Sequence, residues 1–132
     1  MQRGGKADRA AAKNLYQICR ATCISHFDTV YAYCGGTDEK FLGDLCDKDR
    51  DVLLIATKAG YFRDACKASI LANFDQCQPP LKMDVIDVPY LHRFNSKTSL
   101  KETLETFAEL KQSGKIRYVG IYNFSAWQGM DT

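Results

Sequence analysis

Four polar residues with complementary acid–base chemistry come directly after, or close behind, short apolar runs of the sequence. They are Asp28, Tyr33, Lys58 and His92. Taken singly, an aspartate that forms a turn, a lysine solvated at the surface and a structural histidine are the commoner roles. Taken together, a carboxylate, a phenol, an ammonium and an imidazole form a plausible proton-transfer set.

The chemistry of such a set is the protonation of a carbonyl oxygen. A tyrosine with a pKa of about 10 is a weak acid at neutral pH, and a nearby ammonium stabilises the phenolate and lowers that pKa. A buried ammonium needs a counter-charge, which Asp28 can supply to Lys58. The imidazole of His92 can polarise the carbonyl through its N–H. Because no side chain donates hydride, reduction of the carbonyl carbon requires a nicotinamide.

Four apolar runs are typical of buried strands. The first three carry Asp28, Lys58 and His92 at or near their ends, and the fourth ends in Tyr122-Asn123. Their centres recur at intervals of roughly 30 residues, the length of one strand, one helix and their connections. The run VLLIA is continuous rather than alternating, which is typical of a parallel strand covered on both faces. The predicted strands are residues 23–30, 51–59, 83–91 and 116–124.

Helical patterns fill the intervals between the apolar runs. Ser99 and Glu102 predict a capping box at the start of the last helix, and Gly114 a left-handed cap at its end. The third helix is expected to stop before Pro79-Pro80. The predicted helices are about 6–20, 38–46, within 62–76, and 99–113.

The alternation of helices and strands predicts an α/β fold with a parallel sheet and right-handed crossovers. Its regularity favours a (β/α)8 TIM barrel, in which functional residues gather at the carboxyl ends of the strands. A complete barrel needs about 250 residues. We therefore expect residues 1–132 to form a single incomplete domain, a partial barrel of about four parallel strands.

Composition excludes several classes of protein. The 132 residues are 45% hydrophobic and 26% charged, and the net charge of +2 gives no support to a nucleic-acid partner. No apolar run approaches the length of about 18 residues that a membrane span needs, and the basic N-terminus lacks the apolar core of a secretory signal. We interpret that N-terminus as an amphipathic helix rather than a transit peptide. Because no secretory signal is found, a cytoplasmic protein with reduced thiols is expected. The spacing of the six cysteines does not suggest a zinc site.

With these residues in place, the sequence resembles the aldo-keto reductases, which are NADP(H)-dependent aldehyde and ketone reductases built on a (β/α)8 barrel. The matching stretches are FDTVYAYCGGTDEKFLG, LLIATKAG, DVIDVPYLHRF and ETLETFAELKQSGKIRYVGIYNFSAW, in the family's order. The GGTDEKFLG segment and the YLH form are most similar to the branch that contains aflatoxin-aldehyde reductases. The resemblance implies that Tyr33 is the general acid, Asp28 the partner of Lys58, Lys58 the group that lowers the tyrosine's pKa, and His92 the group that orients the carbonyl.

The resemblance also identifies a residue that would contact the cofactor, and the sequence departs from the family's usual pattern at several positions. Asn123 matches the asparagine that hydrogen-bonds the nicotinamide carboxamide of NADP(H). Tyr122 replaces the serine that usually precedes it, so one carboxamide contact is lost or taken by a phenol. Phe94-Asn95 replaces the usual Pro-Asp after the histidine, and the segment after Lys58 is shorter than usual.

The resemblance spans about residues 22–128, which correspond to strands two to five of the family's barrel. The first strand, strands six to eight and the basic segment that binds the 2′-phosphate have no counterpart in the 132 residues. We therefore expect a fragment or shortened form of a reductase, with doubtful activity of its own and possible self-association that covers the open strand edges. Two alternatives remain: a non-catalytic partner-binding or regulatory barrel fragment, and a decayed, truncated gene product.

Overall fold

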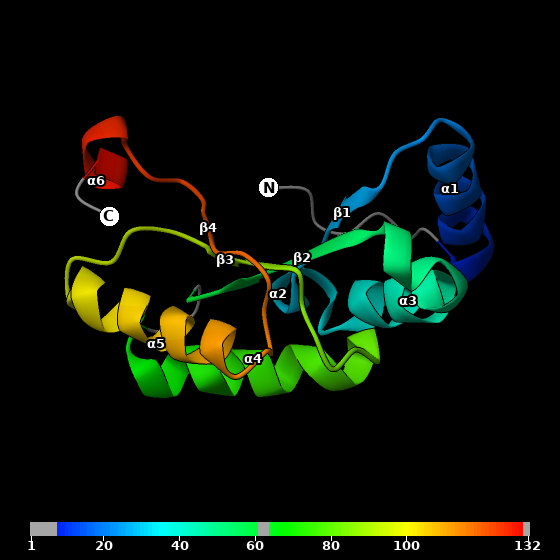
Figure 1. Cartoon of the computed structure of the whole chain (residues 1–132). Coiled ribbons are helices and arrows are strands. Elements are labelled where there is room, and N and C mark those ends of the chain that lie inside the picture. The colour runs from blue at the N-terminus through cyan, green and yellow to red at the C-terminus, as the bar shows by residue number, and fades with distance from the viewer. Residues whose placement is uncertain (1–7, 61–63, 131–132) are drawn as a thin grey trace.

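The computed structural model describes residues 8–60 and 64–130, apart from the side chain of Tyr33. At its centre is one four-stranded sheet in the order β1-β2-β3-β4, and every neighbouring pair is parallel (Figure 1). The strands are β1 (His26–Asp28), β2 (Leu54–Ala59), β3 (Val88–Leu91) and β4 (Gly120–Ile121). The predicted parallel α/β architecture is thus confirmed.

Helices cover one face of this sheet. Figure 1 shows α3, α4 and α5 along that face, α1 beside the β1 end and α6 beyond β4; in the described ranges no helix lies over the middle of the opposite face. No helix there is long and apolar enough to cross a membrane. The helical elements are α1 (Arg9–Ala21), α2 (Tyr31–Cys34), α3 (Thr37–Cys46), η1 (Asp47–Val52), α4 (Lys67–Leu81), α5 (Leu100–Gln112) and α6 (Ala126–Met130).

The strands are shorter than the apolar runs that predicted them, most of all β4, which has two residues in place of 116–124. A single parallel bridge, Ile86 to Ile116, precedes it. Between the bridge and β4, the backbone N–H groups of Arg117 and Tyr118 both donate to the carbonyl of Asp87. Two donors on one acceptor interrupt the even ladder of a parallel pair, and so the regular strand begins only at Gly120.

Helix α4 corrects the predicted end of the third helix. It continues through Pro79 and Pro80, which have no N–H to donate to the carbonyls of Asp75 and Gln76. Both of those residues are exposed, so water can donate to the carbonyls instead. The extra turn is retained because it buries Leu81, whose side chain is fully enclosed in the core.

Helix α5 ends as predicted but begins differently. Gly114, at φ +74°, follows its last turn in the left-handed conformation. Ser99 makes no side-chain capping bond, and so the predicted capping box is wrong. The carboxylate of Glu102 instead accepts the backbone N–H of Lys67 at 3.1 Å. This carboxylate therefore caps a free N–H group in the first turn of α4, because the N-cap residue of α4 makes no side-chain capping bond.

Helices α3 and α4 approach so closely at Gly43 that only glycine fits. A Cβ atom there would lie 2.5 Å from the carbonyl oxygen of Leu81 and 2.7 Å from that of Pro80. Both are backbone atoms and cannot rotate away. Gly43 therefore sets the spacing of two helices that cover the sheet.

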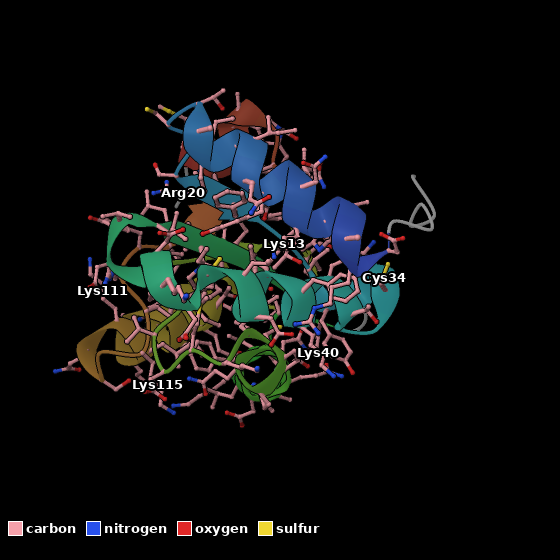
Figure 2. All side chains as sticks on the ribbon, turned by 90° about the vertical axis from the view of Figure 1, so that its right-hand side faces the viewer. Lys13, Arg20, Cys34, Lys40, Lys111 and Lys115 are labelled. Carbon is pink, nitrogen blue, oxygen red and sulfur yellow. The ribbon has the colours of Figure 1, made fainter. Side chains whose placement is uncertain are left out.

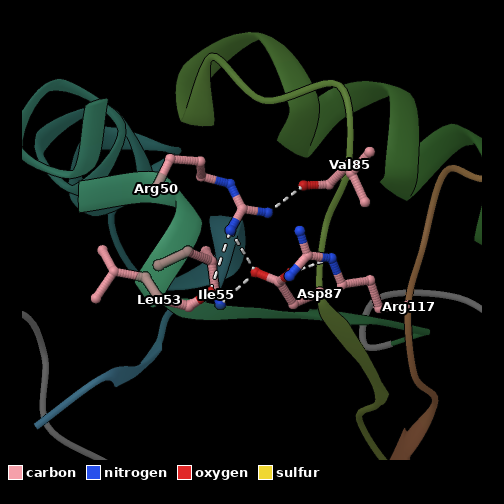
Figure 3. A network of polar contacts seen from close by, with 6 residues as sticks. All are labelled: Arg50, Leu53, Ile55, Val85, Asp87 and Arg117. Carbon is pink, nitrogen blue, oxygen red and sulfur yellow. Dashed lines mark hydrogen bonds and ion pairs between the residues drawn. The ribbon is translucent and has the colours of Figure 1, made fainter. Parts of the chain in front are cut away.

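A buried ionic network joins the amino-terminal ends of the strands (Figure 3). Asp87 is fully buried, accepts the backbone N–H of Ile55 at 2.8 Å, and pairs with Arg50 at 2.8 Å and Arg117 at 3.1 Å. Arg50 also donates to the carbonyl of Val85 at 2.8 Å. One carboxylate thus ties the segments before β2, β3 and β4 together, at the sheet end opposite the polar residues singled out above.

Candidate active site

The parallel sheet brings the carboxyl ends of its strands to one edge, and the sequence-derived candidates lie there. Asp28 ends β1, Lys58 is the penultimate residue of β2, His92 directly follows β3 and Tyr122 directly follows β4. The strand ladder holds two of these positions firmly. The backbone N–H of His92 donates to Ala59, and that of Tyr122 donates to Leu91, both at 2.9 Å.

Asp28 and Lys58 form the ion pair expected from the sequence. The Nζ atom of Lys58 lies 2.5 Å from Oδ2 of Asp28 and 3.2 Å from the carbonyl oxygen of Thr29. The Lys58 side chain is 3% exposed, whereas that of Asp28 is 43% exposed. The carboxylate partner offsets the cost of removing this ammonium from water, while the carboxylate itself remains open to solvent.

His92 lies beside this pair in a buried position, 4% exposed. Burial is the largest cause that lowers its pKa below the ordinary value of 6.5; the positive charges of Lys58 and Arg93 add to the lowering, and Asp28 opposes it. At neutral pH the imidazole is therefore neutral. A neutral imidazole carries one N–H, which can donate to a carbonyl oxygen without adding charge to the site.

Tyr33 has its backbone in α2, a single helical turn that begins three residues after Asp28. A position just behind a predicted strand suggests a loop, but this segment is helical. Its side chain lies outside the described part of the chain. Gly35 and Gly36 end this helical turn in the left-handed conformation, with φ values of +60° and +84°. Tyr31, the other tyrosine of the segment, packs against the core with its ring next to Gly36.

Tyr122 and Asn123 border His92 from the β4 side. The ring of Tyr122 lies 5.4 Å from the Lys58 Nζ atom and 5.7 Å from the His92 ring, which it meets edge-on. Asn123 has φ +56°, and its Nδ2 atom donates to the His92 carbonyl at 3.3 Å. An amide and a phenol next to each other have the donors and acceptors that suit a carboxamide, so these two residues fit that end of a nicotinamide.

Two contacts of the site were not predicted from the sequence. The first is the Thr29 carbonyl that receives Lys58, since a backbone acceptor has no signature in a sequence. The second is Glu39 in the first turn of α3, where an acidic residue is common for its favourable interaction with the helix dipole alone. Glu39 is fully buried and accepts the Thr57 hydroxyl at 2.7 Å. Burial is the largest cause that raises its pKa, against hydrogen bonds from Thr57 and Cys77.

Comparison with known proteins decides the family. The sequence model of the aldo/keto reductase family matches residues 1–131. The chain belongs to the aldo/keto reductase family. A solved structure of the aldo-keto reductase AKR11C1 from Bacillus halodurans, in its holo form, superposes with a TM-score of 0.83 at 31% identity. The match covers 89% of this chain and 43% of that chain, so the four strands form part of the family's (β/α)8 barrel.

Curated relatives include reductases of two kinds. The L-glyceraldehyde 3-phosphate reductase of Escherichia coli K12 is 35% identical over 115 residues, which are 77% of this chain and 33% of that protein. Aflatoxin B1 aldehyde reductase member 2 of Rattus norvegicus is 26% identical over 133 residues, 97% of this chain and 36% of that protein. The aflatoxin-aldehyde reductases are thus relatives, at lower identity than the bacterial enzyme. This chain spans about a third of the length of these relatives.

Proposed function

We propose that Asp28, Tyr33, Lys58 and His92 form the proton-transfer site of an NADP(H)-dependent reductase of aldehydes or ketones. The observation that carries the proposal is the buried Lys58 ammonium, held 2.5 Å from Asp28 beside the buried imidazole of His92. Kinship with the aldo/keto reductases supports the reaction class. An isolated structural lysine would extend into solvent, whereas this one is enclosed at a strand end where barrel enzymes place their chemistry.

Each residue has a separate task in this reaction. The phenol of Tyr33 gives its proton to the carbonyl oxygen, and the positive charge of Lys58 stabilises the phenolate that remains. Asp28 balances that charge when no phenolate is present. Neutral His92 donates its N–H to the same carbonyl oxygen and orients it.

The cofactor provides the remaining chemistry. A bound nicotinamide supplies the hydride for the carbonyl carbon. In this chain, Asn123 and Tyr122 would hold the carboxamide of NADP(H), because both lie against His92 and offer amide and phenol groups.

The test replaces the ammonium by an uncharged side chain of similar length. In Lys58→Met, NADPH-dependent reduction of 4-nitrobenzaldehyde should fall about 10²–10⁴-fold, the range that a proton-transfer group contributes. Lys67→Met is the matched control, because Lys67 is an exposed lysine whose ion pair with Glu109 lies at the surface. Turnover that is lost equally in both variants, or in neither, would contradict the proposed role of Lys58.

A further inference from the structure

The segment from Asp28 to Glu39 is tied to strand β2 at both of its ends. At its first end, the Asp28 carboxylate pairs with the ammonium of Lys58. At its last end, Oε1 of Glu39 accepts the Thr57 hydroxyl at 2.7 Å. Thr57 and Lys58 are consecutive residues of β2, and Tyr33 lies between the two ties along the chain. The place of this segment beside the sheet is therefore set by two neighbouring residues of one strand.

The two ties lie on opposite faces of the sheet. Side chains alternate along a strand, so Thr57 and Lys58 point in opposite directions. Thr57 faces the helical layer, where its hydroxyl also lies 3.6 Å from the Cys77 sulfur of α4. Thr57 and Glu39 are both buried, and a hydrogen bond in such a place is stronger than one exposed to water. Helix α3 is thus held to β2 independently of the ion pair on the other face.

Helices α2 and α3 meet tightly, so that a shift of α3 is passed on to the turn that carries Tyr33. Figure 2 shows Cys34 at the end of α2 and Lys40 on α3. At their junction, the N–H of Gly36 donates to the Tyr31 carbonyl at 3.2 Å, and the N–H of Lys40 donates to the Gly36 carbonyl at 2.9 Å. A Cβ atom on Gly36 would lie 2.6 Å from the Tyr31 ring, which leaves no free space between them.

We propose that the buried hydrogen bond between Glu39 and Thr57 positions the segment that carries Tyr33 relative to Lys58. Both are then positioning residues, which act from the helical side of the sheet through the backbone. This role rests on the proposed function, in which Lys58 stabilises the phenolate of Tyr33. Because that stabilisation weakens with distance, a segment that shifts away from β2 gives the phenol a pKa closer to its ordinary value of about 10.

The test measures the pKa of the Tyr33 phenol in the full 132-residue chain, by NMR of protein labelled with carbon-13 at the tyrosine Cζ position. Tyr33→Phe assigns the signal. Thr57→Val removes the hydroxyl and keeps the branched side chain, and this pKa should then rise by about 1. Thr57→Ser keeps the hydroxyl and should keep the parent's value. Thr103→Val is the matched control, because Thr103 is a buried threonine whose hydroxyl donates to the Ala65 carbonyl at 2.9 Å, away from this segment.

A double variant keeps the test decisive if Thr57→Val alone does not fold. Glu39→Leu combined with Thr57→Val replaces both partners by apolar groups, which can be nearly neutral for stability. Loss of a carboxylate would by itself lower the pKa of a nearby phenol. A rise in the double variant therefore reports the lost hydrogen bond and not the lost charge.

The outcomes separate this proposal from the proposed reaction. A rise in Thr57→Val or in the double variant, with Thr57→Ser and Thr103→Val unchanged, supports the positioning role. An unchanged pKa, or an equal rise in Thr57→Ser or Thr103→Val, overturns it. If the pKa rises in Lys58→Met but not when the hydrogen bond is removed, only the positioning role fails. If the pKa is unchanged in Lys58→Met, Lys58 does not act on Tyr33, and the proposed function fails together with the positioning role.

Discussion

Replacement of Asp87 by asparagine should destabilise the fold strongly without touching the candidate active site. Asp87 is fully buried at the amino-terminal end of the sheet and makes a backbone hydrogen bond and two ion pairs (Figure 3). Asparagine has nearly the same shape and can still accept the N–H of Ile55. The variant therefore removes the negative charge and little else.

The size of the effect follows from the exposure of the two arginines. The side chain of Arg50 is 22% exposed, so the charged hydrogen bond that it loses is worth about 1.5–3 kcal/mol. That of Arg117 is 48% exposed, and water screens its pair to about 0.5 kcal/mol. Together these losses predict that the free energy of unfolding falls by about 2–3.5 kcal/mol, a large part of the total of about 5–15 kcal/mol typical for a domain.

Urea unfolding followed by circular dichroism measures this difference directly. Asp84→Asn is the control, because Asp84 lies three residues earlier in the same segment with an exposed side chain. The control should change the free energy of unfolding by less than about 0.5 kcal/mol. A loss below about 1 kcal/mol in Asp87→Asn would refute the reasoning, since the buried network would then contribute no more than a surface pair.

Two further predictions concern the layer of helices behind the sheet. Burial raises the folded-state pKa of Glu39 above its ordinary value of 4.5, so stability should fall as the pH rises from about 4.5 through the folded pKa. Glu39→Gln keeps an acceptor for the Thr57 hydroxyl, so the free energy of unfolding of the variant should change less with pH and be higher than that of the parent at neutral pH. Urea titrations across the pH range measure both effects. If the stability of the variant falls with rising pH as much as that of the parent, Glu39 is excluded as the source of the fall. Gly43→Ala should cost about 1–3 kcal/mol in the same assay, because the methyl group meets the Leu81 backbone, and a neutral effect would show that α3 and α4 separate freely.

The parts of the fold that could be predicted are those with a repeating physical signal. A continuous apolar run predicts a buried strand, and β2 begins inside VLLIA, at Leu54. Because parallel strands share one carboxyl edge, the same pattern placed Asp28, Lys58 and His92 at that edge. The contact between Asp28 and Lys58 followed from the need of a buried ammonium for a partner.

The parts that could not be predicted depend on tertiary contacts. Pro79 and Pro80 end helices by local chemistry, but burial of Leu81 outweighs that preference here. Glu102 fits a capping box in sequence, yet a helix that is distant along the chain takes its carboxylate. Asp87 lies between two apolar residues and has no local partner, so its network with Arg50 and Arg117 appears only when the strands are side by side.

The most direct test of the proposed chemistry compares two tyrosines that lie in the same turn of helix. Tyr33→Phe and Tyr31→Phe each remove one hydroxyl and keep the ring, and turnover is followed as NADPH-dependent reduction of 4-nitrobenzaldehyde. We predict that Tyr33→Phe lowers turnover at least about 10²-fold, whereas Tyr31→Phe, which retains the ring that packs beside Gly36, keeps it. Equal turnover in the two variants would contradict the assignment of Tyr33 as the proton donor.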